Sequence, residues 1–232
     1  MVPPRGPMLG DMTSARPLSP TPRSTPRRHA ERAAADRAEL YTLLDDALIS
    51  HLAVLVDGAP VVVPTGYGRV GDVLYLHGSV ASRSLAAAAE FPVSVAVTLV
   101  DGVVYARASF RCSMNYRSAV VHGTARRVTD PDETCRGLAA ITDHLAPGTW
   151  SYARRPNRKE LAATAVLAVD LAESAVKVRT GPPVDSAEDI AAGPVWAGVV
   201  PVRTAFGTPE GCPSVPAGVA VPEHVTARVS AS

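Results

Sequence analysis

The chain contains little lysine, and its charges are nearly balanced. Only Lys159 and Lys177 are lysines among the 23 basic residues, and 22 acidic residues leave a formal net charge of +1. A charge this close to zero creates no long-range field that would attract nucleic acid or an anionic membrane surface. We therefore expect neither of these as a partner, and any ligand must be recognised by local groups.

Cysteine is also scarce, and long apolar runs are missing. The three cysteines, Cys112, Cys135 and Cys212, are widely spaced, so the sequence predicts neither a disulfide framework nor a cysteine-based metal site. No run approaches the roughly 18 apolar residues of a membrane span, and the N-terminus lacks the apolar core of a signal peptide. These absences predict a soluble, cytoplasmic protein without a metal site.

The length of 232 residues allows one sizeable domain with extensions. Residues 1–28 are rich in proline, arginine and serine without an apolar period, which is typical of a disordered tail. For residues 29–204 we predict one folded domain with a C-terminal extension. Residues 205–232 are rich in proline and glycine and are predicted to form a loose tail.

Between the two tails the pattern predicts mostly strands. Apolar alternation predicts them at residues 50–56, 60–67, 73–77, 93–100, 103–110, 116–128, 165–171, 174–179 and 196–203. The dipeptides Asp57-Gly58 and Asp101-Gly102 are typical of hairpin turns between neighbouring strands. Helices are predicted at 30–47, at 82–90, from Asp130 to about residue 144, and after Asn157, which forms a capping box with Glu160.

This order of elements has no βαβ alternation. We therefore predict a mainly β protein with inserted helices, in which antiparallel strands form a small closed barrel. A parallel nucleotide-binding sheet is disfavoured by the same order.

The junction after the strand at 73–77 is the most informative local feature. His77, Gly78, Ser79 and Ser82 lead into an alanine-rich helix whose first turn carries Arg83. A helix start with hydroxyl groups and a guanidinium can bind a phosphate. Serine before an apolar helix is also the ordinary N-cap, so the junction by itself indicates either an anion site or a simple cap.

Three further segments accompany this junction. They are Ser113-Met114-Asn115-Tyr116-Arg117-Ser118, Lys177-Val178-Arg179-Thr180-Gly181 and Pro194-Val195-Trp196-Ala197-Gly198. Together the four segments resemble the FMN-binding split-barrel family, in the branch related to pyridoxamine 5′-phosphate oxidase and to Nim-type nitroimidazole-resistance flavoproteins. The resemblance covers about residues 28–203. It implies an antiparallel split β-barrel and a homodimer that binds FMN between its subunits.

The resemblance also implies a set of cofactor-binding residues. Those expected beside the isoalloxazine ring or on the neighbouring strand are Pro64, Thr65, Gly66, Tyr67, Leu76 and His77. Those expected around the FMN phosphate are Gly78, Ser79, Ser82 and Arg83. Candidates from the rest of the chain are Asn115, Tyr116, Ser118, Lys177, Arg179 and Trp196. The related oxidase has an Arg-Lys pair at the phosphate, whereas Ser84 follows Arg83 here, so one cation is missing.

Two of these residues have alternative roles. His77 is the candidate catalytic residue, because a histidine beside the flavin can act as an acid or a base; alternatively it donates a hydrogen bond to the ribityl chain or to the loop. Trp196 either stacks on the ring or fills a core or dimer contact.

The resemblance implies an FMN-dependent oxidoreductase that acts on a small molecule, such as a nitro or quinone-type compound. No nucleophile and base pair is visible in the sequence, so this activity rests on the family. The alternatives are a flavin-binding carrier or sensor without turnover, and a split barrel that binds heme or a deazaflavin. True pyridoxamine-phosphate oxidase activity is disfavoured, because the basic cluster for the substrate phosphate is not evident.

Overall fold

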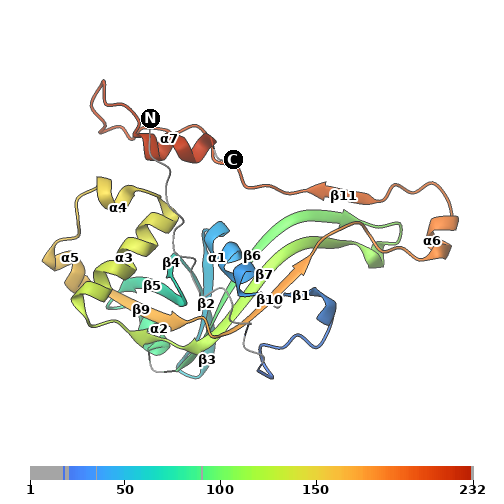
Figure 1. Ribbon diagram of the computed structural model, residues 1–232, viewed down its shortest axis with the longest axis horizontal. Helices are drawn as coiled ribbons and strands as arrows, with labels where there is room; N and C mark the ends of the chain where they lie inside the picture. Colours follow the sequence, from blue (N-terminus) through green and yellow to red (C-terminus); the bar gives the residue numbers. More distant parts are fainter. Residues whose placement is uncertain (1–17, 19–20, 35, 90, 231–232) are drawn as a thin grey trace, which may run out of the picture.

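Two antiparallel sheets form the body of the protein in the computed structural model, which describes Leu18 and residues 21–34, 36–89 and 91–230 (Figure 1). The larger sheet has the order β1-β10-β7-β6-β2-β3, with β11 added to β6, and the smaller has the order β4-β5-β9-β8. Every pairing is antiparallel. The mainly β class is therefore confirmed, and the strands divide between two sheets as in a split barrel.

The elements have the following bounds. The strands are β1 (Ala33–Ala34), β2 (Ser50–Val56), β3 (Ala59–Thr65), β4 (Tyr67–Val70), β5 (Val73–Ser79), β6 (Pro92–Tyr105), β7 (Ser113–Thr124), β8 (Arg126–Arg127), β9 (Thr164–Asp170), β10 (Glu173–Arg179) and β11 (Gly198–Pro201). The helices are α1 (Arg37–Asp46), α2 (Arg83–Ala88), α3 (Pro131–Leu145), α4 (Thr149–Tyr152), α5 (Arg158–Ala163), α6 (Ala187–Ala191) and α7 (Glu223–Ser230). Two short 3₁₀ turns cover Ala30–Arg32 and Ser109–Arg111.

The main core lies between the sheets and beneath α1. Helix α1 buries Leu40, Leu43 and Leu44 there, and β6 contributes alternate valines from Val93 to Val97. A second cluster of buried residues, which includes Tyr75, Leu138 and Val166, joins α3 to the smaller sheet. Alternation along each strand separates these inward residues from an outer face, as the pleat requires.

The first helix is shorter than the sequence predicted. The Asp36 side chain accepts a hydrogen bond from the Ala38 N–H at 2.8 Å and caps α1, so the helix begins at Arg37. Ala33 and Ala34 instead pair with Lys177 and Val176 of β10. The predicted helix at 30–47 was therefore wrong over its first third, because Asp36 is a stronger start signal than the weak apolar period before it.

The Asp57-Gly58 hairpin is confirmed. Both residues have positive φ, 51° for Asp57 and 77° for Gly58, as a type I′ turn between strands requires. The turn joins β2 and β3, whose register places Val56 opposite Ala59.

The predicted hairpin at Asp101-Gly102 was wrong. Strand β6 continues through both residues, and its register against β7 shifts between Val100 and Gly102, which is the signature of a bulge. A Cβ on Gly102 would lie 2.8 Å from Val199 Cγ1, so the glycine lets β11 approach. The dipeptide lies at a bulge in β6, beside which β11 pairs. No local sequence signal distinguishes such a bulge from a hairpin turn.

The other helix starts match the prediction. The Asp130 carboxylate accepts a hydrogen bond from the Glu133 N–H at 2.7 Å and caps α3. Asn157 and Glu160 form both hydrogen bonds of the capping box on α5. The long strand predicted at 116–128 is divided into β7 and β8.

A long arm projects from the body (Figure 1). It consists of residues 100–115 and 179–201, which include the far ends of β6, β7 and β10 together with α6 and β11. The arm exposes large apolar side chains: Phe110 is 96% exposed, Val184 73% and Trp196 67%.

Parts of both predicted tails are described and contact the body. Near the N-terminus, the Arg23 guanidinium binds both carboxylate oxygens of Glu173 at 2.7 Å. Near the C-terminus, α7 places the His224 ring 5.0 Å from that of Tyr152. Residues 1–17 of the predicted disordered tail lie outside the described residues, and the domain boundaries stay a prediction.

Candidate functional site

The junction between β5 and α2 shows how its polar groups are used. The Ser82 hydroxyl accepts a hydrogen bond from the Leu85 N–H at 3.3 Å, and the Ser79 hydroxyl accepts one from the Ala81 N–H at 3.2 Å. Ser82 is thus the N-cap of α2, as the simpler interpretation of the sequence held. Gly78 lies close to the helix, because a Cβ there would be 3.1 Å from Leu85 Cδ2.

Arg83 is the cation at this junction. Its side chain is 74% exposed and forms an ion pair with Asp57 at the β2–β3 turn, whose side chain is 78% exposed. An exposed pair of this kind is weak, because solvent screens it. An incoming anion could therefore replace Asp57 as the partner of the Arg83 guanidinium at little cost in free energy.

The strand predicted beside the ring divides into exposed and buried residues. Pro64 is exposed on β3, whereas Thr65 is buried and donates its hydroxyl to the Val63 carbonyl at 3.2 Å. Gly66 lies against α3, since a Cβ there would be 3.0 Å from Leu145 Cδ1. Of the predicted contacts Pro64, Thr65 and Gly66, Pro64 has the side chain that is exposed to a ligand.

The side chains of Tyr67 and Leu76 belong to the core. The prediction that these side chains contact the flavin was therefore wrong. Both residues are fully buried, and the Tyr67 hydroxyl donates to the carbonyls of Leu44, at 2.6 Å, and Ala47, at 2.8 Å. Burial raises the pKa of Tyr67 far above its ordinary value, so the phenol stays protonated. These side chains position β4 and β5, and a ligand could reach only their backbone.

His77 carries the unsatisfied polar atom of the junction. The residue is partly buried on β5, and burial lowers the pKa of its imidazole. Its Nδ1 is buried and has no hydrogen-bond partner within the described part of the chain. A buried polar atom without a partner is costly, and such atoms mark places where a ligand or water completes the structure. Burial therefore favours the neutral imidazole of His77, and its buried Nδ1 lacks a partner within the described part of the chain.

The remaining predicted residues lie on the sheet and the arm. Arg179 and Asn115 are buried and bound to one another, and the Asn115 amide donates to the Gly181 carbonyl at 3.1 Å. Lys177 donates its Nζ to the Arg28 carbonyl at 2.9 Å. The exposed Trp196 ring lies 5.9 Å from that of Tyr105 on the arm. These side chains serve internal contacts in this chain.

Two further predicted residues are placed by strand register. Ser118 lies opposite Thr98 on one side and Lys177 on the other, and Tyr116 lies opposite Val100. Pro64, His77 and Arg83 lie on β3, β5 and α2 of the body, whereas Trp196 lies just before β11 on the arm (Figure 1).

A cleft that the sequence did not reveal lies where the arm leaves the body. It has a volume of about 600 Å³ and is lined by the end of α1, by β2, β6 and β7, and by residues 202–206 after β11. At its wall the Arg117 guanidinium binds Asp46 at 2.5 Å and Asp101 at 3.1 Å. These carboxylates raise the pKa of Arg117 further above its ordinary value. No single motif could have indicated this cleft, because its residues come from four separate segments of the chain.

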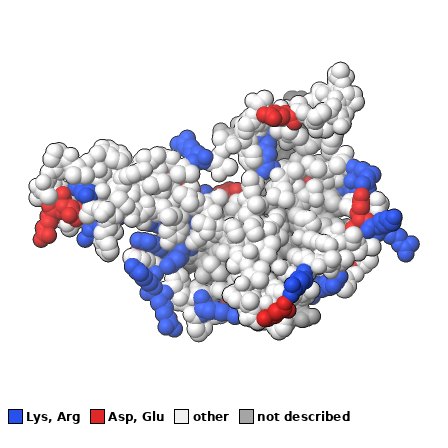
Figure 2. Space-filling model, turned by 180° about the vertical axis from the view of Figure 1, so that it is seen from behind, with Lys and Arg blue, Asp and Glu red and all other residues white. Residues whose placement is uncertain are grey.

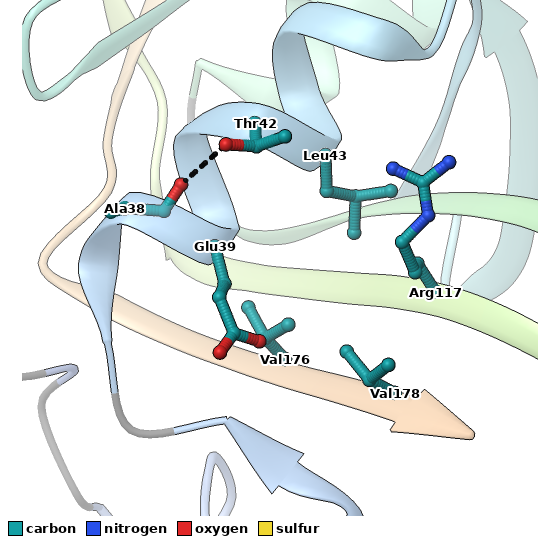
Figure 3. Close-up of a pocket in the computed structure, with 7 residues that line it drawn as sticks. All are labelled: Ala38, Glu39, Thr42, Leu43, Arg117, Val176 and Val178. Carbon is teal, nitrogen blue, oxygen red and sulfur yellow. Dashed lines mark hydrogen bonds between the residues drawn. The ribbon is translucent and has the colours of Figure 1, made fainter. Parts of the chain in front are cut away.

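A smaller, mostly apolar cavity of about 240 Å³ also borders Arg117. Figure 3 shows side chains of α1, including Leu43, facing Val176 and Val178 of β10, with Arg117 at one side. Arg117 lines both cavities, whereas Asp46 and Asp101 line the larger one alone.

Two classes of site are not found among the described residues. No group of three or more histidine, cysteine or acidic side chains in that part of the chain could hold a metal ion. None of the helices described above is both long and apolar enough to cross a membrane.

Comparison with known proteins identifies the fold. A family model described as pyridoxamine 5′-phosphate oxidase matches residues 36–178, whereas no curated protein matches. The flavocytochrome Anf3 from Azotobacter vinelandii is 36% identical, with a TM-score of 0.86 over 91% of this chain and 99% of that chain. The FAD and heme binding protein from Mycobacterium smegmatis is 43% identical, with a TM-score of 0.81 over 85% of this chain and 97% of that chain.

A more distant structure shares the fold alone. It is a candidate 5-nitroimidazole antibiotic resistance protein from Bacteroides thetaiotaomicron, with 22% identity and a TM-score of 0.55 over 63% of this chain and 86% of that chain. The family model covers most of the described body, and the two more similar structures cover nearly the whole chain. The chain therefore belongs to the pyridoxamine 5′-phosphate oxidase-like family of split-barrel proteins.

Proposed function

We propose that this chain is a flavin-dependent oxidoreductase that acts on a small molecule, such as a nitro or quinone-type compound. The observation that carries the proposal is the β5–α2 junction, where Arg83 presents its guanidinium to solvent and His77 holds a buried nitrogen without a partner in the described chain. A phosphate close to dianionic at neutral pH binds guanidinium groups through charge-assisted hydrogen bonds. The donor set thus fits the phosphate of FMN, and equally the FMN half of FAD.

Different residues of the chain would bind the phosphate of the cofactor, contact its ring and position the neighbouring strand. A bound flavin supplies hydride and electron transfer. Arg83 would hold its phosphate, and the exposed Pro64 offers an apolar surface on β3. Tyr67 anchors the start of β4 to the end of α1 through its two hydrogen bonds, which keeps the strand beside Pro64 in a fixed position.

We propose heme as a second cofactor. Two relatives above 30% identity are named as a flavocytochrome and as an FAD and heme binding protein. Neutral imidazole is the form of histidine that binds a metal, and burial favours the neutral form of His77 by lowering its pKa. His77 is therefore the residue we assign to contact with a redox cofactor, as an iron ligand or as a hydrogen-bond partner of the flavin.

The absorption spectrum of the purified protein tests both cofactors. Flavin bands, with FMN and FAD separated by chromatography after release, would support the main proposal; no flavin, and no binding of added flavin, would contradict it. His77→Ala should change the heme bands if the residue binds iron, whereas His29→Ala should not, since His29 lies on the surface beside Glu31. Unchanged heme and flavin spectra in His77→Ala would remove the residue from the site.

The alternative is a flavin-binding carrier or sensor without turnover. It is favoured by the lack of an evident acid and base pair besides His77. Rapid mixing with nicotinamide nucleotides, followed by an electron acceptor, separates the two functions. Fast reduction and reoxidation indicate an enzyme, and a flavin that stays oxidised indicates the carrier or sensor.

We also propose that the protein is a homodimer. The arm exposes Phe110, Val184 and Trp196, and Figure 2 shows wide areas of one face without charged side chains. Exposed apolar patches of this kind are typical of protein interfaces. Sedimentation equilibrium tests the proposal, since a monomer at micromolar concentration would contradict it.

A further inference from the structure

One side of the cleft beside Arg117 is lined by residues 202–206, which follow β11. We call this segment the strap. The Val202 N–H donates to the Asp101 carbonyl at 3.0 Å, and the Arg228 guanidinium of α7 lies 4.2 Å from the centre of the Phe206 ring. Figure 1 shows the chain passing from the arm to α7 above the body. The strap is thus held at both ends above an opening of about 600 Å³, which is within the size range of small-molecule sites.

The charged groups of the cleft differ in how they are used. Arg117 is paired with both Asp46 and Asp101, so a ligand would have to compete with two carboxylates for its guanidinium. Arg203, by contrast, is exposed on the strap and has no ion pair or hydrogen bond from its side chain to any described residue. It is the cation of the cleft that a ligand could bind without breaking an existing pair.

The apolar groups of the cleft come from two parts of the chain. Phe206 and Val202 belong to the strap, and Ile49, which is 51% exposed, belongs to the body. A planar ring in the cleft could cover apolar surface from both parts. The cleft therefore offers a slot for a ring and a guanidinium for an anionic group.

The cleft also borders the strand proposed to lie beside the flavin ring. His51 lines the cleft and lies directly opposite Pro64 in the β2–β3 ladder. Residues opposite one another in an antiparallel ladder have Cα atoms about 4.5–5.5 Å apart and project from the same face. A ring in the cleft would thus lie next to a flavin placed along β3.

We propose that this cleft is the substrate site, and that its substrates are planar ring compounds that carry an anionic group, such as aromatic carboxylates. The role of the bound compound as a substrate rests on the proposed oxidoreductase function. Arg203 binds the anionic group, and Phe206 and Val202 cover the ring. Wild-type protein should therefore prefer an anionic ring compound to its neutral counterpart.

Calorimetric titration with 4-nitrobenzoate and with nitrobenzene tests the proposal. Arg203→Ala should weaken the binding of 4-nitrobenzoate roughly 10- to 100-fold, the usual range for a hydrogen bond to a charged group, and leave nitrobenzene nearly unchanged. Arg154→Ala is the control, because that exposed arginine pairs with Glu160 of α5 and does not line the cleft. Phe206→Ala should weaken both compounds, whereas Phe110→Ala at the arm should weaken neither.

The result that would overturn the proposal is equal binding of the two compounds, no binding of 4-nitrobenzoate, or equal affinities in Arg203→Ala and Arg154→Ala. The titration is repeated with and without added flavin. Protein that takes up flavin but does not bind 4-nitrobenzoate contradicts the cleft alone. Protein that binds 4-nitrobenzoate through Arg203 but takes up no flavin contradicts the proposed function and leaves the cleft as a binding site.

Discussion

Replacing Arg83 tests the proposed flavin site most directly. The side chain is 74% exposed, and its partner in the described structure is Asp57 at the neighbouring turn. Arg83→Ala removes little buried surface and one exposed ion pair, so the free energy of unfolding should change by no more than about 1 kcal/mol. The loss of a guanidinium from a phosphate should instead appear in the affinity for flavin.

The magnitude follows from the two competing contacts of the guanidinium. A hydrogen bond to a charged group contributes about 1.5–3 kcal/mol, and the exposed pair with Asp57 that must be given up contributes about 0.2–1 kcal/mol. The net loss in Arg83→Ala is therefore about 0.5–2.8 kcal/mol, which corresponds to a Kd roughly 2- to 100-fold higher. Because the Ser82 cap is unchanged, α2 should remain folded.

Titration of flavin into cofactor-free protein, followed by the quenching of flavin fluorescence, measures this change. Asp57→Asn is the complementary variant, since asparagine tolerates the positive φ of this position. Without the competing carboxylate it should bind flavin about 1.4- to 5-fold more tightly. Arg154→Ala serves as the exposed control. If Arg83→Ala and this control have the same Kd, or if Asp57→Asn weakens binding, Arg83 does not hold the phosphate.

Three further predictions concern stability. Tyr67→Phe leaves two buried carbonyls without the hydroxyl and should cost about 1–3 kcal/mol, seen as a lower Tm; an unchanged Tm would contradict the role of the hydroxyl. Gly68→Ala places a Cβ 2.3 Å from backbone of α3 and should lower Tm, whereas at Gly123 the nearest atom is 3.5 Å away and alanine should be tolerated. The Arg23 guanidinium lowers the pKa of Glu173 from 4.5 to about 2, so this contact should be complete above about pH 4.5 and lost as the pH falls through about 2; NMR signals of residues 21–28 that do not change over this range would argue against it.

The sequence predicted those features that depend on residues close together in the chain. The Asp57-Gly58 turn, the cap at Asp130 and the capping box of Asn157 and Glu160 each need only three or four neighbouring residues, and all are present. The Asp101-Gly102 turn failed because its outcome depends on β11, nearly a hundred residues later, which approaches at Gly102.

The motifs of the family predicted a set of candidate site residues, but not how the side chains of these residues are used. Tyr67 and Leu76 belong to segments that resemble the family, yet their side chains are buried in the core. His77 and Arg83 differ from them. The Nδ1 of His77 has no hydrogen-bond partner among the described residues, and the guanidinium of Arg83 is largely exposed. Sequence similarity retains both kinds of residue and does not separate them.

The sequence alone determined the antiparallel, mainly β class, the local caps and turns, and membership in a flavin-related family. These follow from periodicity, short-range hydrogen bonds and motif order, which are properties of the chain before it folds. Only the tertiary structure decided that Arg83 meets Asp57, that Arg117 pairs with two aspartates and lines two cavities, and that Arg203 and Phe206 line a cleft. The physical reason is that such contacts join segments tens of residues apart, and their geometry is set by sheet register and by the path of the strap.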